Sequence, residues 1–359
     1  MKHPIFLSAI ALLACLSCGT GEKVAVEYKD YRPLQISSFM AQPELVLLET
    51  PSEEARIRDM RIGRLLLAEN RIFVVDNMGN RILMFDRTGK FLKTTADMAG
   101  IYKKLVDATL DTQEGMLYAY CAEPSQLLAF DLDLNLEKTV PMETSLLEIG
   151  MDEGILYAIR TTENGTELVA FDKNKMEAQP DVVWTQANGT RAKATSEKSL
   201  TVLGDGAYAS LPGSNRICQI RNGKVKKTYD IDFGRQADAA KRIFNICASD
   251  SFLLFNSDIC RQWFILNRQT GKCIMDEQLH NDLCLGSNFY ILPTQGATDG
   301  LVYDMPAAGV NSILTQLKKH QTEFAKNERA EKMNAPYLPF LDKTINPTGN
   351  PMLYFWTIK

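Results

Sequence analysis

One short apolar segment recurs six times along the chain, and this internal repeat limits the possible folds more than any other feature. Aromatic or Leu positions in successive copies are about 37 to 51 residues apart, which is the length of one four-stranded propeller blade. The sequence therefore predicts an all-β fold, a six-bladed β-propeller. The copies begin at Ile72, Leu117, Leu156, Ala207, Phe252 and Phe289.

A second recurrent segment, which we interpret as the third strand of each blade, supports the same count. Its copies end in a polar residue and a turn, as in Phe-Asp-x-x-Gly-Lys at 85–90. Glycine supplies a positive φ at low steric cost, and the acid can accept hydrogen bonds from the turn. We therefore interpret Asp86, Asp131 and Asp172 as structural. The third-strand copies are Arg81–Asp86, Gln126–Asp131, Glu167–Asp172, Arg216–Arg221 and Gln262–Asn267.

The sixth repeat differs, because a helical pattern follows what we take as its third strand at Gly300–Asp304. Ile313, Leu317 and Phe324 recur at helical spacing, which predicts an amphipathic helix over about 310–334, covered by the propeller's own outer surface. The chain ends in a strand-like segment, Met352–Ile358. A closed ring requires both chain ends in the last blade, so we expect Leu45–Leu48 to join that segment.

The N-terminus has the pattern of a secretion signal over residues 1–17. Lys2 precedes an apolar run, Ile5–Ala14, that is too short to span a bilayer comfortably. Cys15 and Cys18 each follow a small residue, as in a bacterial lipobox. The polar stretch after Cys18 favours that residue as the lipidation site, with Cys15 as the alternative. Residues 18–43 are then expected to be a tether and residues 44–359 the propeller.

Composition excludes some partners and leaves the thiol chemistry open. The net charge is −4, and no basic block could follow a phosphate backbone, so we expect no nucleic acid. Six further cysteines permit disulfides, but a chain of this size does not need them. Free buried thiols and a bridge among Cys247, Cys260, Cys273 and Cys284 are both compatible with the sequence. We expect no metal and no cofactor.

Blade geometry selects candidate ligand-binding residues without any motif. Loops between second and third strands emerge on the same face as the segments between blades, where propeller ligands usually bind. Arginine is frequent there, and its planar fork suits carboxylates or phosphates. The alternative is that these arginines pair with neighbouring Asp and Glu between blades. The candidates are Arg58, Asn80, Arg81, Lys104, Asp107, Arg216, Arg242 and Arg261.

The signal, the tether, the Phe-Asp-x-x-Gly-Lys turns and the terminal segment Asn350–Tyr354 together resemble the six-bladed β-propeller lipoproteins of Bacteroidetes, a TolB-like family. Asn80-Arg81-Ile82 and Asn215-Arg216-Ile217 are similar to openings of NHL-type repeats. The resemblance implies an exported propeller. Many members carry Gly-Pro-Gly-Glu where this chain has Asp97–Tyr102, so a function attached to that segment is not expected here.

Two function classes follow. The first is a binding or scaffold lipoprotein of the cell envelope, attached to the outer membrane by its lipid, with its ligand at the mouth of the central channel. Its ligand would be an anionic small molecule, a glycan or a protein. The alternative is a propeller hydrolase or lyase acting on a carbohydrate or lactone. The sequence has no Ser-His-Asp set, nucleophile elbow or HExxH motif, so we assign no catalytic residues.

Overall fold

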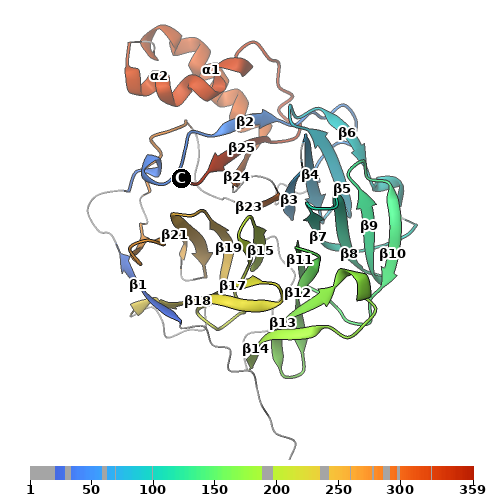
Figure 1. The fold of residues 1–359 in the computed structure, drawn as a ribbon. Coiled ribbons are helices and arrows are strands. Elements are labelled where there is room, and N and C mark those ends of the chain that lie inside the picture. Colours follow the sequence, from blue (N-terminus) through green and yellow to red (C-terminus); the bar gives the residue numbers. More distant parts are fainter. Residues whose placement is uncertain are drawn as a thin grey trace, which may run out of the picture.

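In the computed structural model, antiparallel strands are arranged around an axis as a β-propeller, seen end-on in Figure 1. The structure describes residues 21–28, 34–58, 63–68, 70–98, 100–187, 197–234, 242–258, 260–276, 279–285, 292–296, 300–324 and 326–359. This confirms the all-β propeller class predicted from the repeats.

Units of four strands follow one another along the chain, and each runs from the axis to the rim. The first three are β3 (Arg64–Ala68), β4 (Arg71–Asp76), β5 (Arg81–Asp86) and β6 (Phe91–Thr94); β7 (Leu105–Asp111), β8 (Met116–Ala122), β9 (Ser125–Asp131) and β10 (Leu136–Pro141); and β11 (Glu148–Asp152), β12 (Ile155–Thr162), β13 (Gly165–Asp172) and β14 (Asp181–Ala187). The next two are β15 (Leu200–Leu203), β16 (Gly206–Ala209), β17 (Arg216–Arg221) and β18 (Lys224–Asp232); and β19 (Ile243–Ala248), β20 (Phe252–Ser257), β21 (Cys260–Asn267) and β22 (Cys273–Met275).

The recurrent segments occupy the second and third strands of these units, as predicted. Because neighbouring strands are antiparallel, the chain alternates between two faces. We call the face with the second-to-third loops and the inter-unit segments the loop face. We call the opposite one, with the first-to-second and third-to-fourth turns, the turn face. Short 3-10 helices lie in connections: η1 (Ile36–Ser38), η2 (Ala96–Met98) and η3 (Lys173–Lys175).

The structural role of the Phe-Asp-x-x-Gly-Lys turns is confirmed at the first of them. Asp86 Oδ1 accepts hydrogen bonds from the N–H groups of Thr88 and Lys90 at 2.8 and 3.0 Å. Gly89 has a φ of 89°, and a Cβ there would meet the carbonyl oxygen of Leu47 at 2.1 Å. Only glycine fits this position without moving the backbone.

Both ends of the chain complete the last unit, as the closure argument predicted. Its order is β23 (Leu292–Gly296), β24 (Gly300–Met305), β25 (Met352–Thr357) and β2 (Glu44–Leu47). In the antiparallel β2–β25 pair, Leu45 lies opposite Tyr354. One assignment was wrong: β24 is the second strand of this unit rather than the third, because β23 takes the place next to the axis. Of the predicted copy Phe289–Leu292, only Leu292 belongs to the described residues, and it begins β23.

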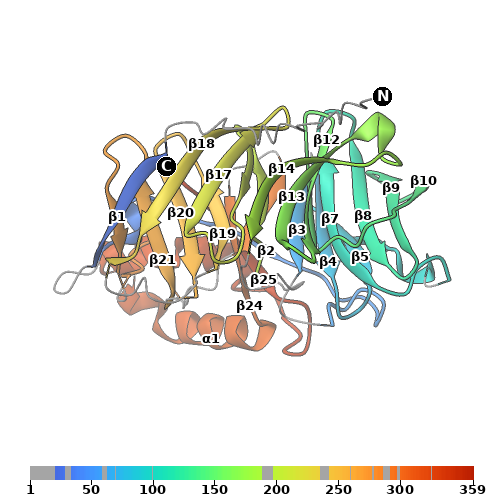
Figure 2. The ribbon, with the colours of Figure 1, turned by 90° about the horizontal axis from the view of Figure 1, so that it is seen from below.

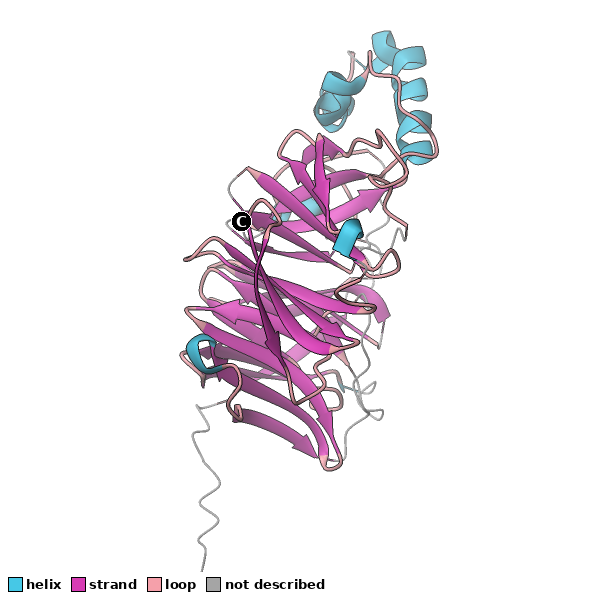
Figure 3. Ribbon diagram, turned by 90° about the vertical axis from the view of Figure 1, so that its right-hand side faces the viewer, coloured by secondary structure: helices cyan, strands magenta, loops and turns pink. Residues whose placement is uncertain are grey.

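The helical insertion therefore connects the second and third strands of the last unit, on the loop face. It consists of α1 (Ala307–Phe324), α2 (Glu328–Asn334) and the 3-10 helix η5 (Ala335–Phe340). The helices lie outside the ring, beside β2 and β25 (Figure 1), and α1 runs along one side of the strands (Figure 2). The predicted single helix is thus two helices, and they project from one edge of the strand layer (Figure 3).

The propeller covers the apolar side of α1, as predicted, although the stripe differs in part. Val310, Leu314 and Leu317 are buried in one cluster with Tyr354 of β25, whereas the predicted Ile313 is only partly buried against it. The observed stripe follows i, i+4, i+7 from Val310, which is the spacing of one helix face.

The N-terminal segment differs from the predicted tether over residues 18–43. Strand β1 (Glu22–Tyr28) lies parallel to β18 and β22 and joins these two outer strands (Figure 1). Val24 is fully buried, and Val26 packs against the same cluster. Alternate apolar residues suit a half-buried strand, although the charged residues between them made the segment look polar. Further along, Ile36, Phe39 and Met40 are buried as well.

The described cysteines match the free-thiol alternative. Cys121, Cys218, Cys247, Cys273 and Cys284 are buried, and none of these five is in a disulfide. Burial raises the pKa of the Cys121 and Cys273 thiols to about 12, so both are protonated at neutral pH. Cys15 and Cys18 lie outside the described residues, as does the side chain of Cys260. Within the described parts of the chain, no helix is both long and apolar enough to cross a membrane.

Candidate functional site

A buried ion pair lies across the propeller axis near the loop face. Arg64 of β3 donates from Nε and Nη2 to Asp107 of β7, at 3.0 and 2.9 Å. Its Nη2 also donates to the carbonyl oxygen of Leu200 at 3.2 Å. Leu200 belongs to β15, three units further along the chain, so the guanidinium reaches across the axis. Arg64 and Asp107 are 2% and 0% exposed. The candidate residue Asp107 is therefore enclosed by protein.

Two further charged side chains complete this axial network of Arg64, Asp107, Glu148 and Lys198. Lys198 Nζ lies 3.2 Å from Asp107 Oδ1, and Glu148 Oε2 accepts the N–H groups of Ser199 and Leu200, both at 2.8 Å. Burial works against the Asp107 charge, but Arg64 and Lys198 outweigh it and keep the pKa of Asp107 low. Burial, with repulsion from Asp107, raises the pKa of Glu148.

The candidate arginines on the loop face do not share one site. Arg81 is 4% exposed; its Nε lies 3.4 Å from Asp76 Oδ2, and Nη2 donates to the carbonyl of Arg56. Arg216 Nε donates to Asp230 on the neighbouring strand β18. Each guanidinium therefore pairs with a carboxylate of its own unit, whereas the structural alternative placed such pairs between blades.

Arg242 is held between two units. Its guanidinium pairs with Glu197, in the segment that leads into the preceding unit, and lies over the ring of Phe244 at 4.6 Å from the centroid. Arg58 and Lys104 are exposed. The backbone N–H of Arg58 donates to Asp76 Oδ2 at 3.1 Å, and the carbonyl of Lys104 accepts the N–H of Ala122 at 2.9 Å. The side chain of Arg261, in β21, lies outside the described atoms.

Asn80 has a structural role in the same loops. Its Oδ1 accepts the N–H of Leu105, and its φ is 54°, a value that Asn tolerates better than most residues. Asp76 Oδ1 accepts the N–H of Gly79 at 2.8 Å. The Asp76–Asn80 segment is therefore a tight turn.

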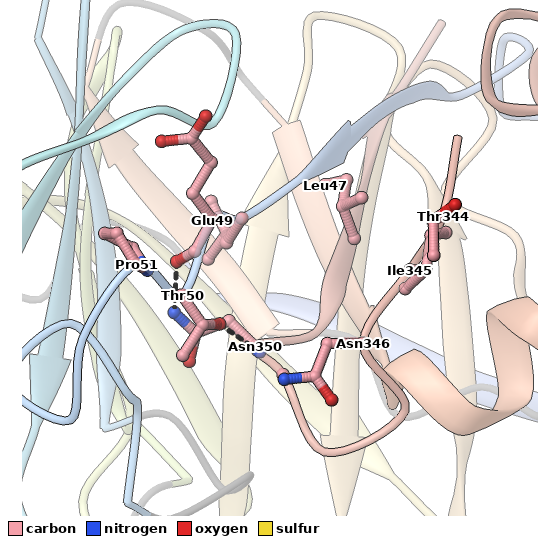
Figure 4. Close-up of a pocket in the computed structure, with 10 residues that line it drawn as sticks. Leu47, Glu49, Thr50, Pro51, Thr344, Ile345, Asn346 and Asn350 are labelled. Atoms are coloured by element: carbon pink, nitrogen blue, oxygen red, sulfur yellow. Dashed lines mark hydrogen bonds between the residues drawn. The ribbon is translucent and has the colours of Figure 1, made fainter. Parts of the chain in front are cut away.

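A cavity of about 370 Å³ on the loop face lies between the chain after β2 and the chain returning from the helices (Figure 4). The side chain of Asn350 makes three hydrogen bonds in the wall of this cavity. Its Nδ2 donates to the carbonyls of Glu49 and Ala55 at 2.7 Å each, and its Oδ1 accepts the N–H of Ile57 at 2.8 Å. In Figure 4 the backbone N–H of Asn350 also bonds Thr50. These hydrogen bonds occupy the side-chain amide of Asn350 and join the two segments of chain, so we assign Asn350 a structural role.

A different cavity lies on the turn face, where inner strands β7, β11 and β15 end. This inner cavity has a volume of about 160 Å³ and is lined by Leu110–Gln113, Met151–Glu153 and Val202–Gly204. A more open space of about 540 Å³ shares Gln113 and Glu153 with it and extends past Asp172 to Lys224. We call the two together the turn-face groove.

Most acids around the inner cavity already have a cationic partner. Asp111 Oδ2 lies 3.1 Å from Lys173 Nζ, and Asp111 Oδ1 accepts the N–H of Gln113 at 3.1 Å. Glu153 Oε1 lies 2.6 Å from Arg221 Nη2. These contacts fix the rim of the cavity.

Asp152 is the exception. Its Oδ2 is buried and has no hydrogen-bond partner among the described residues. Burial raises the pKa of Asp152 to about 6; the charges of Glu153 and Asp205 act in the same direction, and Arg221 opposes them. A titratable group with a perturbed pKa in a cavity marks a candidate functional site. We therefore take the turn-face groove, with Asp152 at its inner end, as the candidate site.

Sequence reasoning missed this site because it considered only the loop face. A signal was available: acids recur in the first-to-second-strand turns of three successive units. They occur in Asp111-Thr112-Gln113-Glu114-Gly115, Asp152-Glu153-Gly154 and Gly204-Asp205-Gly206. Each turn looks ordinary alone, and only the ring brings the three together.

The fold and this site define the chain as a β-propeller with a polar groove at one end of its axis. The model of a family described as "Domain of unknown function (DUF4934)" matches residues 22–357, and the chain belongs to this family. No curated protein matches the chain.

Solved structures show the same fold at low sequence identity. A crystal structure from Bacteroides fragilis NCTC 9343, described as a "putative exported protein", has a TM-score of 0.63 and 12% identity, and the match covers 94% of this chain and 99% of that chain. The WD40 domain of Neurospora crassa Pan2 has a TM-score of 0.44 and 10% identity, with 67% and 71% covered. BamB from Moraxella catarrhalis has a TM-score of 0.38 and 12% identity, with 65% and 66% covered. At such identities the first of these shows the fold alone.

Replacing Asp152 by Asn should stabilise the protein at neutral pH. The folded-state pKa of about 6 lies above the ordinary value of about 4. The unfolded chain therefore loses this proton first, and stability falls as pH rises between these values. The melting temperature of Asp152→Asn should exceed that of the wild type at pH 7.5 and equal it near pH 4. Asp172→Asn, at an exposed turn, should change little at either pH. A lower melting temperature for Asp152→Asn at pH 7.5 would contradict this interpretation.

Proposed function

We propose that this chain is an exported, lipid-anchored protein of TolB-like type, a six-bladed β-propeller if each four-stranded unit is one blade, and that it binds a polar ligand. The ligand site is the turn-face groove rather than the loop face. The observation that carries this proposal is the inner cavity lined by Asp152, whose Oδ2 has no hydrogen-bond partner among the described residues, beside a wider space that shares Gln113 and Glu153 with it.

The shape and lining of the groove support binding. Small-molecule sites are concave, largely pre-formed, and usually a few hundred Å³ in volume. The outer part has acids, amides and lysines side by side, including Asp181, Asn222 and Lys224, which suits a ligand with several hydrogen-bonding groups. The ends of three inner strands frame the inner part, so its polar groups are held in place before a ligand arrives.

The N-terminal strand supports an anchored arrangement. Cys18 is four residues before Glu22, the first residue of β1, and an extended chain spans at most about 3.6 Å per residue. Lipid on Cys18 would hold β1 within about 15 Å of a membrane surface. Because β1 pairs with both β18 and β22, the ring would lie close to that surface. The exported description of the Bacteroides fragilis structure is consistent with this location.

Replacement of both Cys15 and Cys18 by Ala should release the protein from the membrane fraction. Stable anchoring of a protein without a transmembrane helix requires its lipid chains. Fractionation followed by immunoblotting measures the change, with Cys121→Ala, a buried thiol, as the matched control. Continued membrane association of the double variant would refute the lipid anchor.

A bulky side chain at the inner cavity should abolish ligand binding while the fold persists. Thr112 is exposed and lines the cavity, so Thr112→Trp would fill it. The control is Glu163→Trp, at an exposed position in a loop-face connection. Ligands found in a thermal-shift screen of glycans, amines and organic acids should stabilise the wild type and Glu163→Trp, but not Thr112→Trp. Equal stabilisation of all three proteins would place binding elsewhere.

A further inference from the structure

We infer that the inner cavity binds a primary ammonium group, with the carboxylate of Asp152 as its counter-ion. This inference rests on the proposed function, because it names the ligand chemistry of the same groove.

The charges facing Asp152 leave one negative group without a partner. Glu153, next to it, pairs with Arg221 of the fourth unit. Asp205, in the β15–β16 turn, accepts the hydroxyl of Tyr208 at 2.7 Å and lies 3.2 Å from Arg268.

On the side of the second unit, Lys173 serves two acids: its Nζ lies 3.1 Å from Asp111 Oδ2 and 2.6 Å from Glu114 Oε1. The acids Asp111, Glu114, Asp152, Glu153 and Asp205 thus share the cations Lys173, Arg221 and Arg268. None of these contacts involves the carboxyl group of Asp152. Its Oδ2 is buried and has no hydrogen-bond donor among the described residues.

The missing partner must be a hydrogen-bond donor, and a positive charge satisfies the site best. A buried acceptor without a donor costs free energy, and the neighbouring acids make the potential at Asp152 negative. The cavity walls also contain Leu110, Met151 and Val202, which suit the alkyl carbons beside an amine. A volume of about 160 Å³ accommodates an aminoalkyl end but not a large ring system. A primary ammonium on a short alkyl chain fits these features together.

The test uses n-butylammonium, with n-butanol as the neutral molecule of similar shape, titrated into the full chain by NMR at pH 7.5. Wild type should bind the ammonium at least about tenfold more tightly than the alcohol, since hydrogen bonds between charged groups are the stronger ones. Asp152→Asn should lose at least about tenfold of that affinity. Asp97→Asn, which removes an exposed carboxylate of η2 outside the groove, should change it less than about twofold.

Acid should weaken the same interaction. Asp152 must be ionised to act as counter-ion, and its pKa is about 6, whereas an alkylammonium keeps its charge throughout this range. Lowering the pH from 7.5 to 5 should therefore reduce affinity about tenfold in wild type and leave Asp152→Asn unchanged. The melting temperature of Asp152→Asn should not fall below that of the wild type, which separates loss of binding from loss of fold.

Three competitors distinguish the sources of such a group: Nα-acetyl-lysine amide for peptides, glucosamine for amino sugars and 1,5-diaminopentane for polyamines. Displacement of n-butylammonium by any of them, but not by its N-acetylated form, supports the inference and assigns the source. Equal affinity for butanol and butylammonium, or equal displacement by N-acetylated forms, would overturn it. If neutral ligands still bind and Thr112→Trp blocks them, the proposed function stands and only the ammonium assignment fails.

Discussion

The pair formed by Arg64 and Asp107 joins the inner strands of the first two units, and both side chains are removed from water. Each charge would be costly to bury alone, because the desolvation penalty amounts to several kcal/mol per ion. Arg64 also bonds the carbonyl of Leu200, Lys198 approaches Asp107, and Glu148 binds the backbone of β15. Units one to four are thereby coupled at the axis, where each group depends on the others.

This network determines where a ligand can bind. It lies near the starts of the inner strands, where β23 approaches both β7 and β15 across the axis. The polar groups at the loop-face end therefore bind one another. The opposite ends of β7, β11 and β15 frame the inner cavity, where Asp152 Oδ2 has no hydrogen-bond donor among the described residues. Strands β7 and β11 thus carry Asp107 and Glu148 near one end and contribute to the candidate site at the other.

Much of the fold could be predicted from the sequence, because repeats and turns are local signals. The apolar copies, the Asp86-type turns and the β2–β25 closure follow from patterning and from the need to pair sheet edges. Strand β1 was missed because its parallel pairing with β18 and β22 depends on distant strands. The site was missed for a related reason. The expected position of Arg81 on the loop face did not show that its guanidinium would pair with Asp76. The cavity lined by Asp152 is built from three units that are far apart in the sequence.

The most direct test of this account is a double-mutant cycle on Arg64 and Asp107, measured by denaturant unfolding. Arg64→Met and Asp107→Leu should each cost about 3–5 kcal/mol, because each leaves a buried charge without its partner. The double variant should cost much less than the sum, with a coupling energy of about 2–3 kcal/mol. The exposed pair of Arg87 and Glu44 should show a coupling of less than about 1 kcal/mol. Additive effects at Arg64 and Asp107, within about 0.5 kcal/mol, would contradict the claim that this pair holds the axis of the propeller together.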